Sequence, residues 1–268
     1  MKILFQSDDY GISRAQAQGC LFAIQNGIIK NTGFFSNMDW AEEVFEWIKP
    51  YLNDIAFGID LNASTGPSVL PHEEIPVLTH EDDMFLGSRE NRALDTDEND
   101  HDHLAECKEQ LYKEFEAQIQ KFIKIVGKNP DYIHNHAYGT KTTAEVTHEL
   151  AVKYGCISTA SLIERDEVAY SGMGWYTYGG DISAQLNGDL ASYLIEDKGK
   201  MLSSKKEYGY VICHTGYVDM PVFEMSSFNV CRAKDLEAMT SDKVKEWIQN
   251  NDIECITFND LPRKWIEK

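Results

Sequence analysis

The chain has 268 residues, of which 43% are hydrophobic and 11% aromatic. This composition is typical of a globular protein with a large core, and it excludes a disordered chain. The formal net charge of −19 excludes nucleic acid and anionic membrane as main partners, because both would repel the protein. No apolar run is long enough for a signal peptide or a membrane span, so we expect a cytoplasmic protein.

The first apolar run, residues 3–5, leads to two adjacent carboxylates, Asp8 and Asp9, which are followed by Gly11. A strand can carry the pair to the edge of a sheet, and the glycine lets the chain turn away. Two neighbouring anions are costly unless a cation, a proton or water offsets them. The pair therefore indicates a metal site, with a solvated turn or a helix N-terminal charge pair as the alternative.

Three later apolar runs also end in residues that can bind a metal ion. One ends at Asp60 and Asn62, the next at His134 and His136, and the last at His214. In an α/β barrel the carboxyl ends of the strands meet on one face. Side chains two residues apart on a strand share a face, so both histidines of the second run can point into one space. These runs predict one site.

Strands and helices are expected to alternate along the chain, beginning with a helix that Ser13 caps and that ends before Gly27. The further expected elements are a strand within 28–38, helix 40–52, a strand ending at 60, helix 104–126, a strand reaching 136, helix 142–154, strand 156–160, a strand reaching 214, helix 241–250 and strand 253–258. This order predicts an α/β fold, either a parallel barrel or a doubly wound sheet, in a single domain over residues 1–268.

Two segments interrupt the alternation. Residues 72–109 are strongly acidic and are expected to form a solvated excursion from the core. Residues 164–200 are rich in glycine and aromatic residues and predict an irregular lid or wall. Its rings, Trp175, Tyr176 and Tyr178, can stack on sugars or can pack within the lid itself.

Five ordered motifs resemble those of the YdjC-like (ChbG/HpnK) carbohydrate deacetylases. They lie at residues 6–11, 36–43, 58–62, 133–136 and 213–219, so the resemblance covers nearly the whole chain. It implies an irregular (β/α) TIM-like barrel that removes acetyl groups from N-acetylated sugars such as chitooligosaccharides. It also implies one divalent metal ion, Mg²⁺ or Zn²⁺.

By this resemblance, Asp8 is the general base, Asp9 and His136 are metal ligands, and His214 lies near the leaving group. The chain departs from the family pattern at two positions, with Asp60 in place of a ligand histidine and His134 in place of an aspartate. A carboxylate at 60 is still a competent ligand. The expected metal ligands are therefore Asp9, Asp60 and His136.

Amide hydrolysis needs a base for the proton of water and an acid for the departing amine. Asp8 and His214 are expected to fill these catalytic roles. Three further residues, Asn62, His134 and Tyr217, are expected to contact substrate or to support the ligands.

Two other functions stay open at this point. One is a metal-dependent hydrolase of another bond such as a phosphoester, although Lys141 is the only cation near the histidine motifs. The other is a non-catalytic sugar-binding protein with a degenerate site, which the aspartate at 60 suggests. The sequence also leaves open the sugar, the native metal and whether the chain forms a homodimer.

Overall fold

The computed structural model describes residues 1–95, 102–176 and 181–266. Within them, the strands form one parallel sheet in the order β5-β4-β3-β2-β1-β7-β6, and β8 pairs with β1 beside this path. The strands are β1 (Lys2–Tyr10), β2 (Asn31–Phe34), β3 (Ala56–Leu61), β4 (Tyr132–Asn135), β5 (Ile157–Ser158), β6 (Val168–Tyr170), β7 (Tyr208–Cys213) and β8 (Glu254–Ile256).

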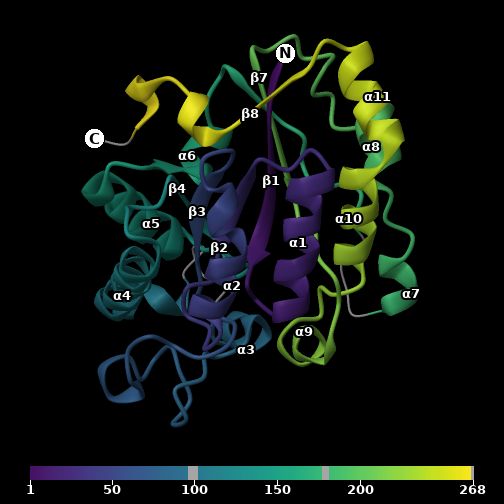
Figure 1. The fold of residues 1–268 in the computed structure, drawn as a ribbon. Coiled ribbons are helices and arrows are strands. Elements are labelled where there is room, and N and C mark those ends of the chain that lie inside the picture. The colour runs from purple at the N-terminus through teal and green to yellow at the C-terminus, as the bar shows by residue number, and fades with distance from the viewer. Residues whose placement is uncertain (96–101, 177–180, 267–268) are drawn as a thin grey trace.

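Helices connect the strands and cover the outside of the curled sheet (Figure 1). The α-helices are α1 (Arg14–Asn26), α2 (Ala41–Ile48), α3 (Ser88–Leu94), α4 (Lys108–Val126), α5 (Lys141–Tyr154), α6 (Thr159–Ile163), α7 (Ile182–Gln185), α8 (Leu190–Ile195), α9 (Met220–Met225), α10 (Cys231–Thr240) and α11 (Asp242–Asn250). In the described part of the chain, no helix is both long and apolar enough to cross a bilayer. The parallel, curled sheet with outer helices confirms the predicted irregular (β/α) barrel in one domain.

Strand β1 lies at the centre of this arrangement. Its residues Lys2–Ser7 pair with Tyr208–Cys213 of β7, while its start also pairs with β8 and its end with β2. All residues from Ile3 to Tyr10 are buried. The carboxyl end of β1 therefore carries Asp8 and Asp9 to the middle of the sheet edge where the parallel strands end.

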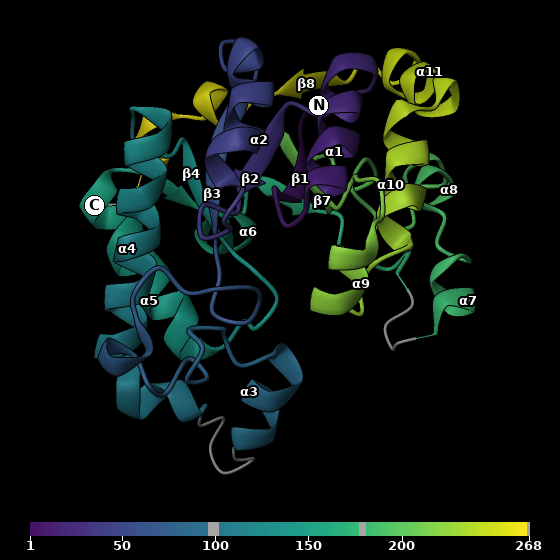
Figure 2. The ribbon, with the colours of Figure 1, turned by 60° about the horizontal axis from the view of Figure 1, so that its bottom comes forward.

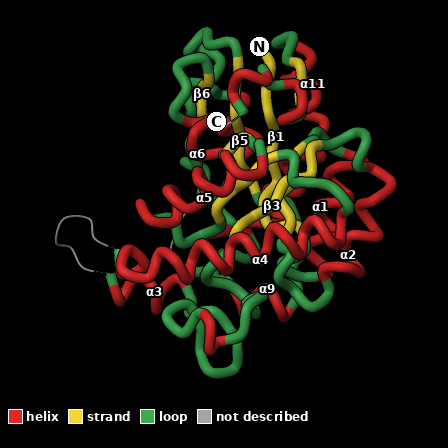
Figure 3. The backbone as a smooth tube through the Cα atoms, turned by 90° about the vertical axis from the view of Figure 1, so that its left-hand side faces the viewer, coloured by secondary structure: helices red, strands yellow, loops and turns green. Residues whose placement is uncertain are grey.

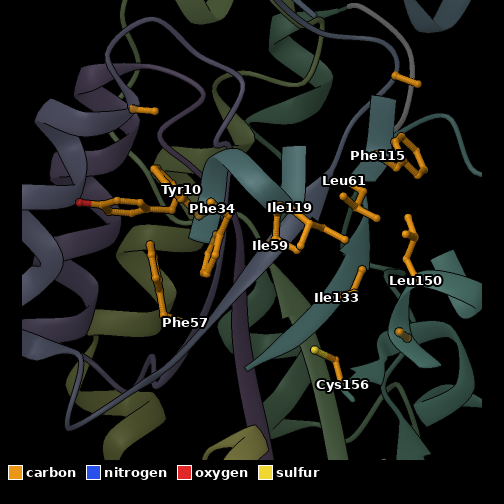
Figure 4. Close-up of a cluster of buried hydrophobic side chains, with 14 of the residues drawn as sticks. Tyr10, Phe34, Phe57, Ile59, Leu61, Phe115, Ile119, Ile133, Leu150 and Cys156 are labelled. Atoms are coloured by element: carbon orange, nitrogen blue, oxygen red, sulfur yellow. The ribbon is translucent and has the colours of Figure 1, made fainter. Parts of the chain in front are cut away.

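An aromatic and aliphatic core holds the strands against the helices on one side of the sheet. Figure 4 shows Ile59 of β3 beside Ile119 of α4, in one cluster that also contains Phe57, Ile133 and Phe115. These side chains are fully buried. A core packed at this density fixes the strands, and so it also fixes the positions of the side chains at their ends.

Several expected elements differ from the structure at their ends. Helix α1 begins and ends as predicted, because the Ser13 side chain accepts a hydrogen bond from Gln16 N and Gly27 follows the last turn. The strand expected at 156–160 was wrong beyond Ser158, whose side chain caps α6 and so starts a helix there. Residues 164–200 are more regular than predicted, since they include β6, α7 and α8.

The acidic excursion lies at the end of the sheet where the strands finish. In Figure 2, α3 stands on one side of this end and α9 on the other, and Figure 3 shows both below the sheet. The excursion is not wholly solvated, because Ile75, Leu78 and Phe85 are buried in the same core as α4. Most of its longest acidic run, residues 96–100, lies outside the described residues.

Candidate active site

Both carboxylates of the first motif enter one site because β1 is irregular at its end. The register with β2 shifts between Ser7 and Tyr10, and Asp9 has a left-handed φ of 67°. Successive side chains of a regular strand point to opposite faces. A bulge with one left-handed residue changes that direction, so Asp8 and Asp9 meet the same group of histidines.

Asp8 is buried between two imidazoles. Its Oδ2 lies 3.1 Å from His134 Nε2 and 4.0 Å from His214 Nε2, and Gln6 donates a hydrogen bond to its Oδ1. Burial alone would raise the pKa of Asp8, but the charge and hydrogen bond of His134 outweigh it and hold the pKa below its usual value. Asp8 is therefore an anion at neutral pH.

His134 is the cationic partner of Asp8. Burial lowers its pKa, but the charge of Asp8 outweighs burial and raises the pKa to about 9. Its other ring nitrogen, Nδ1, lies 2.6 Å from Thr159 Oγ1, which fixes the ring. At neutral pH the His134 ring is therefore protonated and positively charged.

Asp9 is held on both sides. Its Oδ1 lies 2.7 Å from His136 Nδ1, and its Oδ2 lies 2.7 Å from a guanidinium nitrogen of Arg232. Burial raises the pKa of Asp9, but His136 and Arg232 together hold it well below its usual value. Since Arg232 is only 1% exposed, this ion pair is almost fully shielded from water.

Asp60 is the direct register neighbour of His134 on the adjacent strand. Its Oδ2 accepts a hydrogen bond from the backbone amide of Asp9 at 2.6 Å, while its Oδ1 is buried without a hydrogen-bond partner among the described residues. Burial, with the nearby charge of Asp8, raises the pKa of Asp60 well above its usual value. Gly33 leaves room for this side chain, because a Cβ there would lie 1.7 Å from Asp60 Oδ1.

Of the three predicted metal ligands, the structure brings the side chains of two into direct contact. Asp9 and His136 are in direct contact, and Asp60 Oδ1 is a buried oxygen without a hydrogen-bond partner in the described structure. Carboxylate and imidazole are donors that divalent ions accept. However, residues 1–95, 102–176 and 181–266 contain no ready group of three His, Cys, Asp or Glu ligands. The donors fit a divalent ion on Asp9 and His136, to which Asp60 Oδ1 would add a third donor.

His214, at the end of β7, belongs to a hydrogen-bonded chain. Its Nδ1 lies 3.0 Å from the Tyr176 hydroxyl, which donates to Asp235, and Asp235 also accepts the backbone amide of His214 at 2.8 Å. Because the Tyr176 hydroxyl donates to Asp235, its oxygen can accept from His214, and on this ground we assign the ring proton to Nδ1. In this tautomer, His214 Nε2 faces Asp8 without a proton.

Burial is the main cause of the pKa shifts of His214 and Asp235 in this series of hydrogen bonds. Burial lowers the pKa of His214 to about 4 and raises that of Asp235 to about 7. His214 is consequently neutral at neutral pH, although two carboxylates lie nearby.

The supporting residues lie in different places. The Asn62 side chain is used in a local turn, accepting from Ser64 N and donating to Thr65 O, and Thr65 Oγ1 lies 3.3 Å from His136 Nε2. Asn62 thus supports His136 through Thr65. Tyr217 instead lies beside Phe22 of α1, with ring centroids 6.4 Å apart.

The aromatic wall is partly a support for His214. Trp175 and Tyr176 are buried, and the Trp175 indole donates to Asp235 at 3.1 Å. This arrangement matches packing within the lid and leaves little ring surface for stacking on a sugar. Tyr178 lies outside the described residues.

Sequence reasoning missed Arg232 and Asp235, which both come from α10. They are spaced i, i+3, so they share one face of the helix, and both are buried. A charged pair within a run containing Cys231 and Leu236 was the available signal, but it equally describes an exposed helix. The site therefore has a second cation, which the histidine motifs did not indicate.

Comparison with known families places these residues in context. The sequence profile of the YdjC-like protein family matches residues 2–250. A carbohydrate deacetylase 2 of Listeria innocua is 24% identical, and the match covers 98% of this chain and 100% of the relative. A carbohydrate deacetylase of Clostridium beijerinckii is 26% identical over 97% of this chain and 100% of its own.

Solved structures share the fold. A protein of Enterococcus faecalis V583, provisionally named a cellobiose-phosphate cleavage protein, superposes with a TM-score of 0.76 and 23% identity, covering 96% of this chain and 97% of its own. A family 4 acetyl xylan esterase of Clostridium thermocellum, in complex with a cobalt ion, gives a TM-score of 0.50 at 10% identity, with 97% and 89% covered. At these identities the likeness concerns the fold alone.

Proposed function

Because the chain belongs to the YdjC-like protein family, we propose that it is a metal-dependent hydrolase that removes the acetyl group from an N-acetylated sugar. The observation that carries the proposal is the buried Asp8 anion, 3.1 Å from one imidazole and 4.0 Å from another. Full-length relatives named carbohydrate deacetylases support the reaction class. A base and a proton carrier at this spacing are what amide hydrolysis requires.

Asp8 takes the proton of the attacking water in this proposal. It is ionised at neutral pH, and His134 and Gln6 hold its carboxylate in one orientation. The attack forms a tetrahedral carbon that carries the new hydroxyl and the amine.

His214 then delivers a proton to the departing nitrogen. Its Nε2, unprotonated in the assigned tautomer, lies 4.0 Å from Asp8 Oδ2, so the proton that Asp8 received reaches it through one bridging water. Tyr176 and Asp235 hold the ring through Nδ1 and stabilise the transient imidazolium. The amine leaves with the proton, and acetate remains.

Asp9 and His136, joined by Asp60, are the residues that would hold the divalent ion. When bound, such an ion polarises the acetyl carbonyl and makes its carbon a better electrophile. Arg232 keeps the Asp9 carboxylate oriented toward His136, and the Asp9 backbone amide holds the Asp60 carboxylate beside them.

The test is acetate release from a panel of N-acetylated mono- and oligosaccharides, measured together with metal content. We expect release from at least one substrate and loss of that release after chelation, with recovery on adding Mg²⁺ or Zn²⁺. Metal-independent release would contradict the metal-dependent part, and no release from any acetylated sugar would contradict the deacetylase.

A phosphoester hydrolase is the second candidate. Two observations favour keeping it: the buried cation Arg232 in the site, and the name of the Enterococcus faecalis structure, which refers to a sugar phosphate. Phosphorylated sugars belong in the same panel. Phosphate release without acetate release would replace the first proposal by the second.

A further inference from the structure

Helix α1 carries a buried amide, Gln16, whose side chain contacts both segments that bear Asp8 and His214. Its Oε1 accepts a hydrogen bond from the backbone amide of Gly11 at 2.9 Å. Its Nε2 donates to the backbone carbonyls of Asp8 at 3.3 Å and of Thr215 at 3.2 Å. Thr215 directly follows His214 in the chain. One fully buried side chain therefore joins the segment of Asp8 to the segment of His214.

The pairing of β1 with β7 ends just before these two segments. Its last register pair is Ser7 with Cys213, one residue short of Asp8 and of His214. Beyond Ser7, the register of β1 with β2 also shifts. The relative position of Asp8 and His214 therefore depends on side-chain contacts beyond the paired strands, and the Gln16 bridge is one of these contacts.

The loop after β7 lies directly on the face of α1 that carries Gln16. A Cβ at Gly216 would lie 2.8 Å from Gln16 Cγ, and a Cβ at Gly19 would lie 2.2 Å from the backbone nitrogen of Tyr217. Either contact is too short for a carbon atom. Positions 16 and 19 share a face because they lie one turn apart on the helix. The two glycines thus permit the close approach that brings the Thr215 carbonyl to Gln16 Nε2.

We propose that Gln16 is a positioning residue that sets the distance between Asp8 and His214, an inference that rests on the proposed function. Asp235 holds the backbone amide of His214 from α10, whereas Gln16 links the His214 segment to that of Asp8. The spacing matters to the reaction, because a misplacement of reacting groups by about 1 Å can lower turnover by about 10²-fold.

The first experiment compares Gln16→Met with a matched control, Asn31→Leu. Methionine and leucine have nearly the shape of the amides they replace but lack their strong hydrogen bonds. Asn31 is also fully buried, and it makes bonds of the same kinds. Its side chain donates to the carbonyls of Phe5 and Ile256 and accepts from the amide of Phe258. The two variants should therefore lose thermal stability to a similar extent.

Turnover should distinguish the two variants. We expect Gln16→Met to lower kcat for acetate release by about 10²-fold while KM stays within about twofold of wild type, because the base and the proton carrier are misplaced but the substrate contacts remain. Asn31→Leu should keep kcat near the wild-type value, because its hydrogen bonds join β1 to the end of β8 and the turn after it. Equal kcat values in the two variants would mean that Gln16 has a structural role only, and the inference would be wrong.

A milder variant keeps every hydrogen-bonding group and answers the same question if Gln16→Met does not fold. Gly216→Ala adds one methyl group against Gln16 Cγ and should lower kcat by about tenfold through the same displacement. A wild-type kcat in Gly216→Ala would contradict the inference.

Crystal structures of the wild type and of these variants give a measurement that does not need turnover. The distance between Asp8 Oδ2 and His214 Nε2 is 4.0 Å in the wild type. It should increase by about 1 Å in Gln16→Met and stay the same in Asn31→Leu. An unchanged distance in Gln16→Met overturns the inference. If the distance increases but the wild type releases no acetate from any sugar, the proposed function fails and the positioning by Gln16 stands.

Discussion

The two sides of the site are built on different principles. One side, which we call the strand side, consists of Asp8, Asp9, Asp60, His134 and His136, all at or just beyond the ends of β1, β3 and β4. The other, the helix side, consists of Tyr176, His214, Arg232 and Asp235. On the strand side, charged side chains form direct ion pairs. On the helix side, hydrogen bonds to Tyr176 and Asp235 position a neutral histidine, His214.

This difference separates two tasks. Direct pairs keep Asp8 and Asp9 ionised in a buried place, because each has a cationic or imidazole partner. Burial does the reverse for His214, because it lowers the pKa of the ring to about 4 and so keeps it uncharged at neutral pH. Groups whose environments push their pKa values apart are suited to acid and base work.

The largest expected effect concerns the base on the strand side. Asp8→Asn should lower kcat by about 10²–10⁴-fold, the usual range for removing a general base, while substrate and metal binding persist. Because the effect falls on the transition state, kcat and kcat/KM should fall together. The measurement is acetate release, with Asp102→Asn as a control, since Asp102 is a buried carboxylate that binds Thr142. Loss of metal in Asp8→Asn would instead exchange the roles of Asp8 and Asp9.

On the helix side, Tyr176→Phe and Asp235→Asn should each lower kcat by about 10–100-fold, the range for residues that orient a functional histidine. Both act through the same ring, so the double variant should be little worse than the worse single one. The measurement is a double-mutant cycle on kcat. Additive effects would mean that Tyr176 and Asp235 do not act on His214 as one chain.

The strand side can be tested through the metal ion that we propose it binds. Asp9→Asn and His136→Ala should each weaken metal binding by about tenfold or more, and Asp60→Asn should do less, because Asp60 contacts the Asp9 amide. Asp60→His should keep metal binding and shift preference from Mg²⁺ toward Zn²⁺, since imidazole is the softer donor. The measurement is metal content with competition titrations. Full occupancy in both Asp9→Asn and His136→Ala would refute this ligand set.

A smaller effect on stability tests the support behind the strand side. Glu114 of α4 is buried, accepts the amides of Val69 and Leu70, and binds Gln118, which in turn binds Asn62. Burial raises its pKa to about 7. The folded state therefore holds this proton more tightly than the unfolded state, whose value is near 4.5.

This difference in pKa fixes the direction in which stability changes with pH. The stabilisation is complete below about pH 4.5 and is lost as pH rises through about 7. Chemical denaturation should show the free energy of unfolding of wild type falling between pH 5 and pH 8 by about 1–3 kcal/mol. Glu114→Gln should flatten this part of the curve, and Glu109→Gln, on the exposed face of α4, should not. Equal slopes in wild type and Glu114→Gln would refute the shift.

The strand side could be predicted from the sequence because it depends on strand ends. Each apolar run stops at its site residue, and parallel strands bring their ends together. The order of these runs along the chain was therefore enough to predict that Asp60 and His134 lie close together. The bulge that turns both Asp8 and Asp9 inward did not follow, since the backbone of Asp9 is set by tertiary contacts.

The helix side could not be predicted in the same way. The side chains of Arg232 and Asp235 enter the site because α10 lies against Asp9 and His214, and no pattern within residues 231–240 encodes that contact. Trp175 and Tyr176 were visible as aromatic residues, but their hydrogen bonds to Asp235 depend on the same packing. Likewise, the regular elements within 164–200 are too short to give a periodic pattern.

The contact between Gly33 and Asp60 restricts the order in which these two positions can change over generations. A Cβ at 33 would begin 1.7 Å from Asp60 Oδ1, so Gly33→Ala meets a fixed obstacle while Asp60 is in place. If Asp60 is first replaced by a smaller residue, the three atoms nearest to that Cβ are removed. Lineages that start from this chain therefore meet less strain when position 60 changes before position 33.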